Sequence, residues 1–195
     1  MLDLFGRRAA IEPPGFHGKL PSRGDFLSRR MPRGFAGTWD AWLQALVEGS
    51  RATLGPAWLE AWLQAPVWHF SLGRKVAGPA PACGILIPSV DRVGRYFPFT
   101  ILGLARPDGV PLATWRPDVE AMALAALEDG FDPAALERDL ARLGPPATEE
   151  APPAGVTRWR TAAGPDRPAA AFDSTGLPPG SRAAALVTGR LAAAG

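Results

Sequence analysis

The stretch that decides the fold is residues 67–105, which read VWHFSLGRKVAGPAPACGILIPSVDRVGRYFPFTILGLA. Residues 67–72 alternate apolar and polar side chains over most of their length, as a half-buried strand does. Residues 83–88 form a short apolar run typical of a buried strand. The aromatic and branched residues 95–105 predict a third strand, with Pro98 marking an edge or a bulge. Three successive strands with short connections predict an antiparallel meander.

Helical periodicity precedes these strands. Apolar residues at positions i, i+3, i+4, i+7 and i+8 predict a helix, and they are Trp39, Trp42, Leu43, Leu46 and Val47. Thr38 is a candidate N-cap, with a start one turn earlier as the alternative. Residues 56–66 predict a second helix between two prolines, with Trp58, Leu59, Trp62 and Leu63 on one side. The tryptophans of both helices are therefore interpreted first as packing residues.

Helical periodicity returns after the strands. The next helix is predicted from apolar residues at helical spacing, namely Trp115, Val119, Met122 and Ala126, and Gly130 ends it. Asp132-Pro133 then places an N-cap before a proline at the first helical position, and predicts a further helix that stops at Gly144.

The C-terminal third has a weaker pattern. Residues 144–155 read as a loop, residues 156–160 and 169–172 as strands, and residues 181–194 as an alanine-rich terminal helix. Helices, then strands, then helices predict an α+β fold in which an antiparallel sheet is flanked by helices. We expect residues 1–14 to be an N-terminal arm and residues 15–195 to form a single compact domain.

Composition excludes several classes of protein. The 195 residues carry a formal net charge of +2, and 21% of them are charged, unlike a disordered chain or a coiled coil. Basic residues are nowhere concentrated beyond Arg7-Arg8 and Arg29-Arg30, so no nucleic-acid surface is expected. No run approaches the roughly 18 apolar residues of a membrane helix, and no secretion signal is evident. The single cysteine excludes an intramolecular disulfide, and we expect a cytoplasmic protein without membrane insertion.

No residue pattern predicts a catalytic, metal or cofactor site. His17, His69 and Cys83 are widely separated and lack the short paired spacings of metal ligands. Cys83 lies beside a glycine in an apolar strand, so we expect burial to raise its thiol pKa and make it inert. The glycines and lysine of residues 15–19 do not match a phosphate-binding loop. A small hydrolase or transferase that uses His17, Cys83 or a carboxylate is the less favoured alternative.

Two polar turns carry the charged residues of greatest interest. They are Arg23 and Asp25, which flank Gly24 after a short strand predicted at residues 15–21, and Asp91, Arg92 and Arg95, which lie between two apolar strands. On one interpretation these are solvated surface charges, which contribute little to stability. On the other interpretation the two turns lie close in space and present an interaction patch. Sequence spacing leaves both interpretations open.

Two segments together resemble the TagF family of type VI secretion-associated proteins. Residues 15–26 read GFHGKLPSRGDF, similar to the family's opening G-[FY]-x-G-K-[LI]-P-x-x-G-D-F signature. Residues 88–98 read PSVDRVGRYFP, similar to its P-S-x-D-x-x-G-R-x-[FY]-P motif. The two segments occur in the family's order. The resemblance is clearest over residues 15–105 and less distinct in the C-terminal third, where Trp159 and Gly176-Leu177-Pro178 are similar.

The resemblance implies a role in restraining type VI secretion. Members of the family act in the cytoplasm as negative regulators of assembly and are associated with the forkhead-associated scaffold protein of the system. Some are fused to a protein phosphatase domain, whose clustered metal-binding aspartates this chain lacks. The implied mechanism is occupancy, in which the domain binds a scaffold or baseplate component and prevents productive assembly. The candidate partner-binding residues are Arg23, Asp25, Asp91, Arg92 and Arg95. A structural subunit of the apparatus is the alternative.

Overall fold

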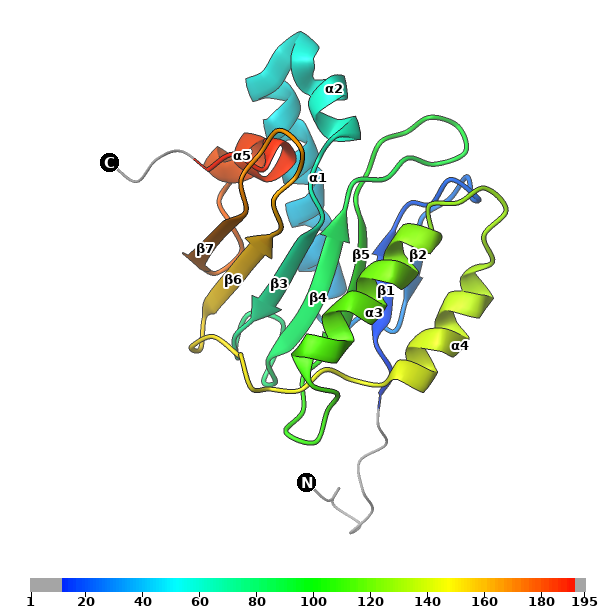
Figure 1. Cartoon of the computed structure of the whole chain (residues 1–195), viewed down its shortest axis with the longest axis vertical. Coiled ribbons are helices and arrows are strands. Elements are labelled where there is room, and N and C mark those ends of the chain that lie inside the picture. Colours follow the sequence, from blue (N-terminus) through cyan, green and yellow to red (C-terminus); the bar gives the residue numbers. More distant parts are fainter. Residues whose placement is uncertain (1–11, 192–195) are drawn as a thin grey trace.

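The predicted meander forms the centre of a seven-stranded antiparallel sheet (Figure 1). The computed structural model describes residues 12–191. The three central strands are β3 (Trp68–Leu72), β4 (Ala82–Ile87) and β5 (Phe99–Leu104). Residues 95–98 of the third predicted strand lie outside β5, and Pro98 precedes its first residue. This placement agrees with a proline that donates no hydrogen bond to a sheet.

Two pairs of strands extend the meander on either side. They are β1 (Gly15–Gly18) with β2 (Leu27–Arg29), and β6 (Val156–Thr161) with β7 (Ala170–Thr175). The order across the sheet is β2-β1-β5-β4-β3-β6-β7, so β1 pairs with β5 and β6 pairs with β3. The sequence does not predict β2, because three residues are too few to establish an alternating pattern.

Helices cover both faces of the sheet, and the predicted α+β fold is confirmed. One face carries α1 (Ala36–Leu54), α2 (Trp58–Leu63) and α5 (Ala183–Thr188), and the other carries α3 (Leu112–Ala125) and α4 (Pro133–Leu143). Short 3-10 turns at Gly55–Ala57 and Gly180–Arg182 precede α2 and α5. The two helical layers create two separate hydrophobic cores.

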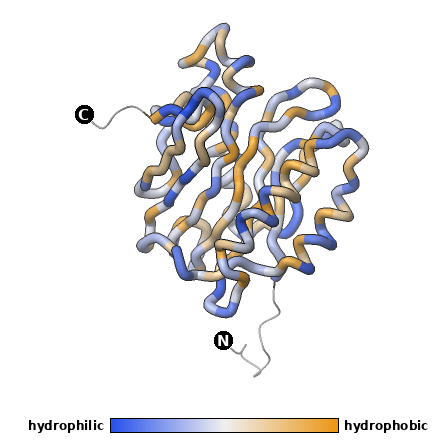
Figure 2. Tube along the Cα trace, in the orientation of Figure 1, coloured by the Kyte–Doolittle hydropathy of each residue, from blue (hydrophilic) through white to orange (hydrophobic). Residues whose placement is uncertain are grey.

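The two cores use alternate residues of the same strands. On the α1 face, the rings of Trp39 and Trp159 stack with centroids 6.4 Å apart, and both side chains are fully buried. On the α3 face, Trp115 packs with apolar side chains of the central strands, including Ile85 and Ile101. Figure 2 shows the resulting hydrophobic band along the central strands. Burial on both faces explains why these strands are more uniformly apolar than a one-sided sheet requires.

All seven tryptophan indole N–H groups donate a hydrogen bond within the protein. The acceptors are Thr100 Oγ1, the Pro178 carbonyl, Ser50 Oγ, the Ser89, Leu186 and Gly144 carbonyls, and Thr157 Oγ1. A buried indole without such an acceptor is costly, so these bonds fix the tryptophans in place. The tryptophans are packing residues, as the sequence predicts.

Several local predictions are wrong or incomplete. The first helix begins at Ala36, so Thr38 is not its N-cap, and the alternative of an earlier start is correct. Leu59 and Leu63 of α2 are 44% and 66% exposed, because only the tryptophan side of this short helix faces the core. The terminal helix ends at Thr188, where Gly189 adopts a φ of 69°. Residues 1–11 of the predicted arm and residues 192–195 lie outside the described residues.

The helix caps give a testable contrast. Asp132 accepts a hydrogen bond from the Ala134 backbone N–H at 3.0 Å and caps α4 as predicted. We expect Asp132→Ala to lower the free energy of unfolding by about 1 kcal/mol, measured by urea titration. Thr38→Ala is the control, because Thr38 is exposed and caps no helix, and its effect should lie within about 0.5 kcal/mol. Equal effects of the two substitutions would contradict the assignment of Asp132 as the cap.

Candidate functional site

The two charged turns identified in the sequence meet in space. The Arg92 backbone N–H donates to the Arg23 carbonyl at 3.0 Å, and Arg95 Nη2 donates to the Gly24 carbonyl. Ser89 Oγ donates to the Lys19 carbonyl at 2.7 Å. We refer to residues 19–26 and 89–95 together as the paired turns. The predicted proximity of the two turns is therefore confirmed, and their role as an interaction patch stays a prediction.

The sheet explains why the turns meet. β1 and β5 are antiparallel neighbours, and Gly18 at the end of β1 stands opposite Phe99 at the start of β5. The chain therefore leaves β1 and enters β5 at the same end of the sheet. Gly18 has a φ of 133°, and a Cβ there would overlap the Pro98 carbonyl oxygen. Glycine permits the close approach from which the paired turns begin.

A buried ion pair connects the paired turns. Lys19 Nζ lies 2.8 Å from Asp91 Oδ2, and the two side chains are 6% and 0% exposed. Arg95 Nε donates to the same carboxylate oxygen at 2.6 Å. The backbone N–H groups of Val93 and Arg95 donate to Oδ1 at 3.0 and 2.9 Å. All the donors to Asp91 come from the paired turns, so this carboxylate holds both turns in one conformation.

The protonation of Asp91 follows from these contacts. Burial alone raises the pKa of a carboxyl group, because it disfavours the charged form. Here the hydrogen bonds from Lys19, Arg95 and Val93 outweigh burial and hold the pKa of Asp91 well below its usual range. Asp91 is therefore ionised at neutral pH and acts as the negative centre of the paired turns. As a candidate partner-binding residue it differs from the others, because its carboxylate is enclosed.

The remaining candidate residues are exposed. Arg23, Asp25 and Arg92 are exposed, and within residues 12–191 their side chains make no hydrogen bond or ion pair. The Arg95 side chain is 57% exposed although its Nε contacts Asp91. These four side chains form the accessible charged part of the paired turns, and their role in binding stays a prediction.

The paired turns also contain two exposed apolar side chains, which the sequence analysis does not single out. Phe26 is 48% exposed and Val93 is 66% exposed. The rings of Phe26 and Phe97 meet edge to face with their centroids 4.8 Å apart, and Lys19 Nζ lies 4.9 Å from the centroid of the Phe26 ring. In the sequence, Val93 is an apolar residue within a charged turn, and such a position indicates an exposed apolar side chain. Exposed aromatic and arginine side chains together are typical of protein-binding surfaces.

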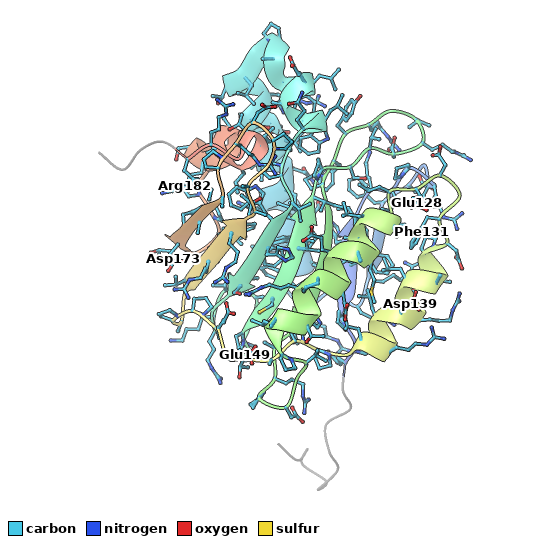
Figure 3. All side chains as sticks on the ribbon, viewed as in Figure 1. Glu128, Phe131, Asp139, Glu149, Asp173 and Arg182 are labelled. Atoms are coloured by element: carbon cyan, nitrogen blue, oxygen red, sulfur yellow. The ribbon has the colours of Figure 1, made fainter. Side chains whose placement is uncertain are left out.

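A second charged surface lies on β6 and β7, and it differs from the paired turns in one respect. Arg158 donates two hydrogen bonds of 2.9 Å to Asp173. Figure 3 shows Asp173 on β7, at the edge of the sheet. Glu150 accepts hydrogen bonds from Arg116 and lies 3.0 Å from Arg160. The hydrogen bond from Arg116 lowers the pKa of Glu150. Each of these charged side chains contacts one of opposite charge, whereas Arg23 and Arg92 have no such partner among residues 12–191.

The histidines and the cysteine do not form one site. His17 Nε2 lies 3.1 Å from Asp40 of α1, and His69 Nε2 lies 2.7 Å from Glu120 of α3, so the sheet separates the two rings. Burial lowers the pKa of His69 and raises the pKa of the Cys83 thiol. Cys83 Sγ contacts Ser71 Oγ at 3.6 Å. Among residues 12–191, no group of three or more histidine, cysteine or acidic side chains is arranged to hold a metal ion.

The hydropathy of the helices is a separate finding. Within residues 12–191, none of the helices combines the length and the apolar character that crossing a membrane requires.

Comparisons with known proteins agree with the two sequence motifs. Residues 15–143 match a family model described as the TagF N-terminal domain, type VI secretion system-associated. The fold is similar to the crystal structure of PA0076 from Pseudomonas aeruginosa PAO1, with a TM-score of 0.78 and 31% sequence identity. This similarity covers 93% of the present chain and 97% of the other. No curated protein matches the chain. The family match includes both paired turns and ends with α4, and the structural similarity extends over most of the chain.

Proposed function

The chain belongs to the TagF family of type VI secretion-associated proteins, and from this membership we propose that it restrains assembly of a type VI secretion system by binding another component. The binding surface in this proposal is the paired turns. The proposed mode of action is occupancy rather than catalysis. In this proposal the protein acts in the cytoplasm, residues 15–195 form one functional domain, and residues 1–14 form an arm.

The convergence of the two family motifs at one surface carries this proposal. Several motif residues have structural roles, since Gly18 allows the close approach and Lys19, Ser89 and Asp91 connect the turns. These internal contacts hold the backbone of the paired turns, which carries the exposed side chains, in a fixed geometry. A surface that is ordered before binding loses less conformational entropy when a partner binds.

The forkhead-associated scaffold protein of the secretion system is the proposed partner. This part of the proposal comes from the family, because other members are associated with that protein. An inhibitor that occupies a scaffold needs an ordered surface and no reactive groups. The paired turns fit that requirement, since they present arginines, a carboxylate and two apolar side chains on a rigid support.

Co-purification from a native host tests the proposed function. We expect the wild-type protein to recover a type VI component and the double variant Arg23→Glu/Arg92→Glu to lose it. The two substitutions replace unpaired positive charges by negative charges, which an electrostatically complementary partner does not accept. The matched control is Arg33→Glu/Lys75→Glu, which reverses two exposed charges outside the paired turns and should recover the component normally. Recovery by all three proteins would refute the paired turns as the binding surface.

Deletion separates a regulator from a structural subunit. Loss of a negative regulator should raise secretion of type VI substrates, whereas loss of a structural subunit should abolish it. Complementation with the Arg23→Glu/Arg92→Glu variant should leave secretion raised if the paired turns bind the partner. Secretion that disappears on deletion would overturn the regulatory proposal in favour of a structural role.

A further inference from the structure

We infer that the paired turns recognise an acidic protein segment that also carries apolar side chains. The inference rests on the proposed function and specifies the chemistry of the partner. It derives from three properties of the paired turns, which are their charge, the absence of internal partners for two arginines, and the exposure of two apolar side chains.

The charge of the paired turns is concentrated. They contain four cationic side chains and two carboxylates, which are Lys19, Arg23, Arg92 and Arg95 with Asp25 and Asp91. Their excess of two positive charges equals the formal net charge of +2 of the complete chain. The charge of Asp91 is enclosed and shared by Lys19 and Arg95. An approaching partner therefore meets a positive surface, and acidic groups are favoured.

The arginines of the paired turns also differ from most arginines in the protein. Most of the other arginines contact a carboxylate, a carbonyl or an aromatic ring, as Arg116 does with Glu150, Arg30 with the Glu137 carbonyl and Arg182 with Phe172. Among residues 12–191, Arg33 and Arg167 are the exceptions outside the paired turns. Within residues 12–191, Arg23 and Arg92 have no such contact. Guanidinium groups bind carboxylates with two parallel hydrogen bonds, so both arginines are available for acidic side chains of a partner.

The apolar component of the surface narrows the class of partner. Phe26 and Val93 are two of the five large apolar side chains that are exposed among residues 12–191. The contacts of Phe26 with Phe97 and Lys19 hold its ring in place while half of its surface stays open. The phosphate backbone of a nucleic acid offers no apolar group to Phe26 and Val93, and the carboxylate of Asp25 repels its phosphate groups. An acidic protein segment with apolar residues satisfies both parts of the surface.

A synthetic peptide of Glu-Glu-Leu repeats provides the probe. We expect it to shift backbone amide resonances of residues 23–26 and 91–95 in the full-length protein, with binding that weakens as sodium chloride rises. Peptides of Gln-Gln-Leu and Glu-Glu-Ser repeats test the charged and apolar parts separately, and both should bind more weakly. Arg23→Glu/Arg92→Glu should weaken binding of the Glu-Glu-Leu peptide at least about tenfold, and Arg33→Glu/Lys75→Glu should not.

Three results would overturn the inference. They are equal binding of the Gln-Gln-Leu peptide, resonance shifts confined to other surfaces, and tighter binding of a single-stranded DNA oligonucleotide at the same turns. The co-purification experiment distinguishes a wrong assignment of the partner's chemistry from a wrong proposed function. If Arg23→Glu/Arg92→Glu abolishes recovery of the type VI component while the peptide does not bind, the acidic partner is wrong and the binding surface stands.

Discussion

Asp91→Ala is expected to lower the free energy of unfolding by about 3–5 kcal/mol, the range observed when one partner of a buried ion pair is removed. The substitution leaves Lys19, whose side chain is only 6% exposed, without a counter-charge. It also removes the acceptor for the backbone N–H groups of Val93 and Arg95. We expect the paired turns to lose their fixed geometry together with this stability.

A double-mutant cycle with Lys19→Met isolates the interaction. Urea unfolding of the two single variants and of the double variant should show that the double substitution costs less than the sum of the single costs, by about 0.5–3 kcal/mol. Asp25→Ala is the control, because this exposed carboxylate has no side-chain contact within residues 12–191 and should change stability by less than about 0.5 kcal/mol. Strictly additive costs would contradict a direct Lys19–Asp91 interaction.

The same carboxylate predicts a dependence of stability on pH. The pKa of Asp91 is lower in the folded protein than in the unfolded chain, where it is about 3.9. Its contribution to stability is therefore fully present above that value and is lost as the pH falls toward its folded pKa. Unfolding measured between pH 7 and pH 3 should show a steeper loss of stability for the wild type than for Asp91→Ala, and parallel curves would exclude this role.

Gly18→Ala is expected to be the second severe substitution, with a loss of about 3 kcal/mol in the free energy of unfolding, because backbone strain and steric overlap both contribute. The φ of 133° at Gly18 lies in a region that side chains rarely adopt, and an added Cβ would overlap the Pro98 carbonyl oxygen. Because that oxygen belongs to the backbone, the overlap can be relieved only by moving β1 away from β5. Thermal unfolding and the amide spectrum of the paired turns should both report the change.

Gly24→Ala is the matched control for Gly18→Ala. An added Cβ at Gly24 has no atom within 4 Å, and the residue has no positive φ. We expect a change of less than about 0.5 kcal/mol, although Gly24 lies in the same family motif. If both substitutions proved equally damaging, the close approach of β1 to β5 would not be the reason for the glycine.

The fold could be predicted where the pattern was local and strong. The central meander, the tryptophan helix and the cap at Asp132 all follow from periodicity or turn chemistry. β2 was missed because a strand of three residues has no period. The sequence places Leu59 and Leu63 on the same side of their helix as Trp58 and Trp62, but periodicity alone does not determine which of these side chains the core buries.

The candidate site was only partly predictable for a different reason. The sequence identifies both charged turns, but their meeting depends on the pairing of β1 with β5, which are not consecutive strands. Whether a charged side chain points outward is decided by its partner, and the partner of Asp91 is Lys19, 72 positions away. Burial therefore separated Asp91 from Arg23 and Arg92, although all three are equally polar in the sequence.

The position of β1 between β2 and β5 also has a consequence for synthesis of the chain. A ribosome adds about 5–20 residues per second, so the roughly 80 residues between β1 and β5 require about 4–16 s. During that interval β1 exposes one edge without its partner, and Lys19 is hydrated because Asp91 has not yet docked against it. Contacts between distant positions slow folding, so the paired turns can connect only after β5 has been synthesised and has paired with β1.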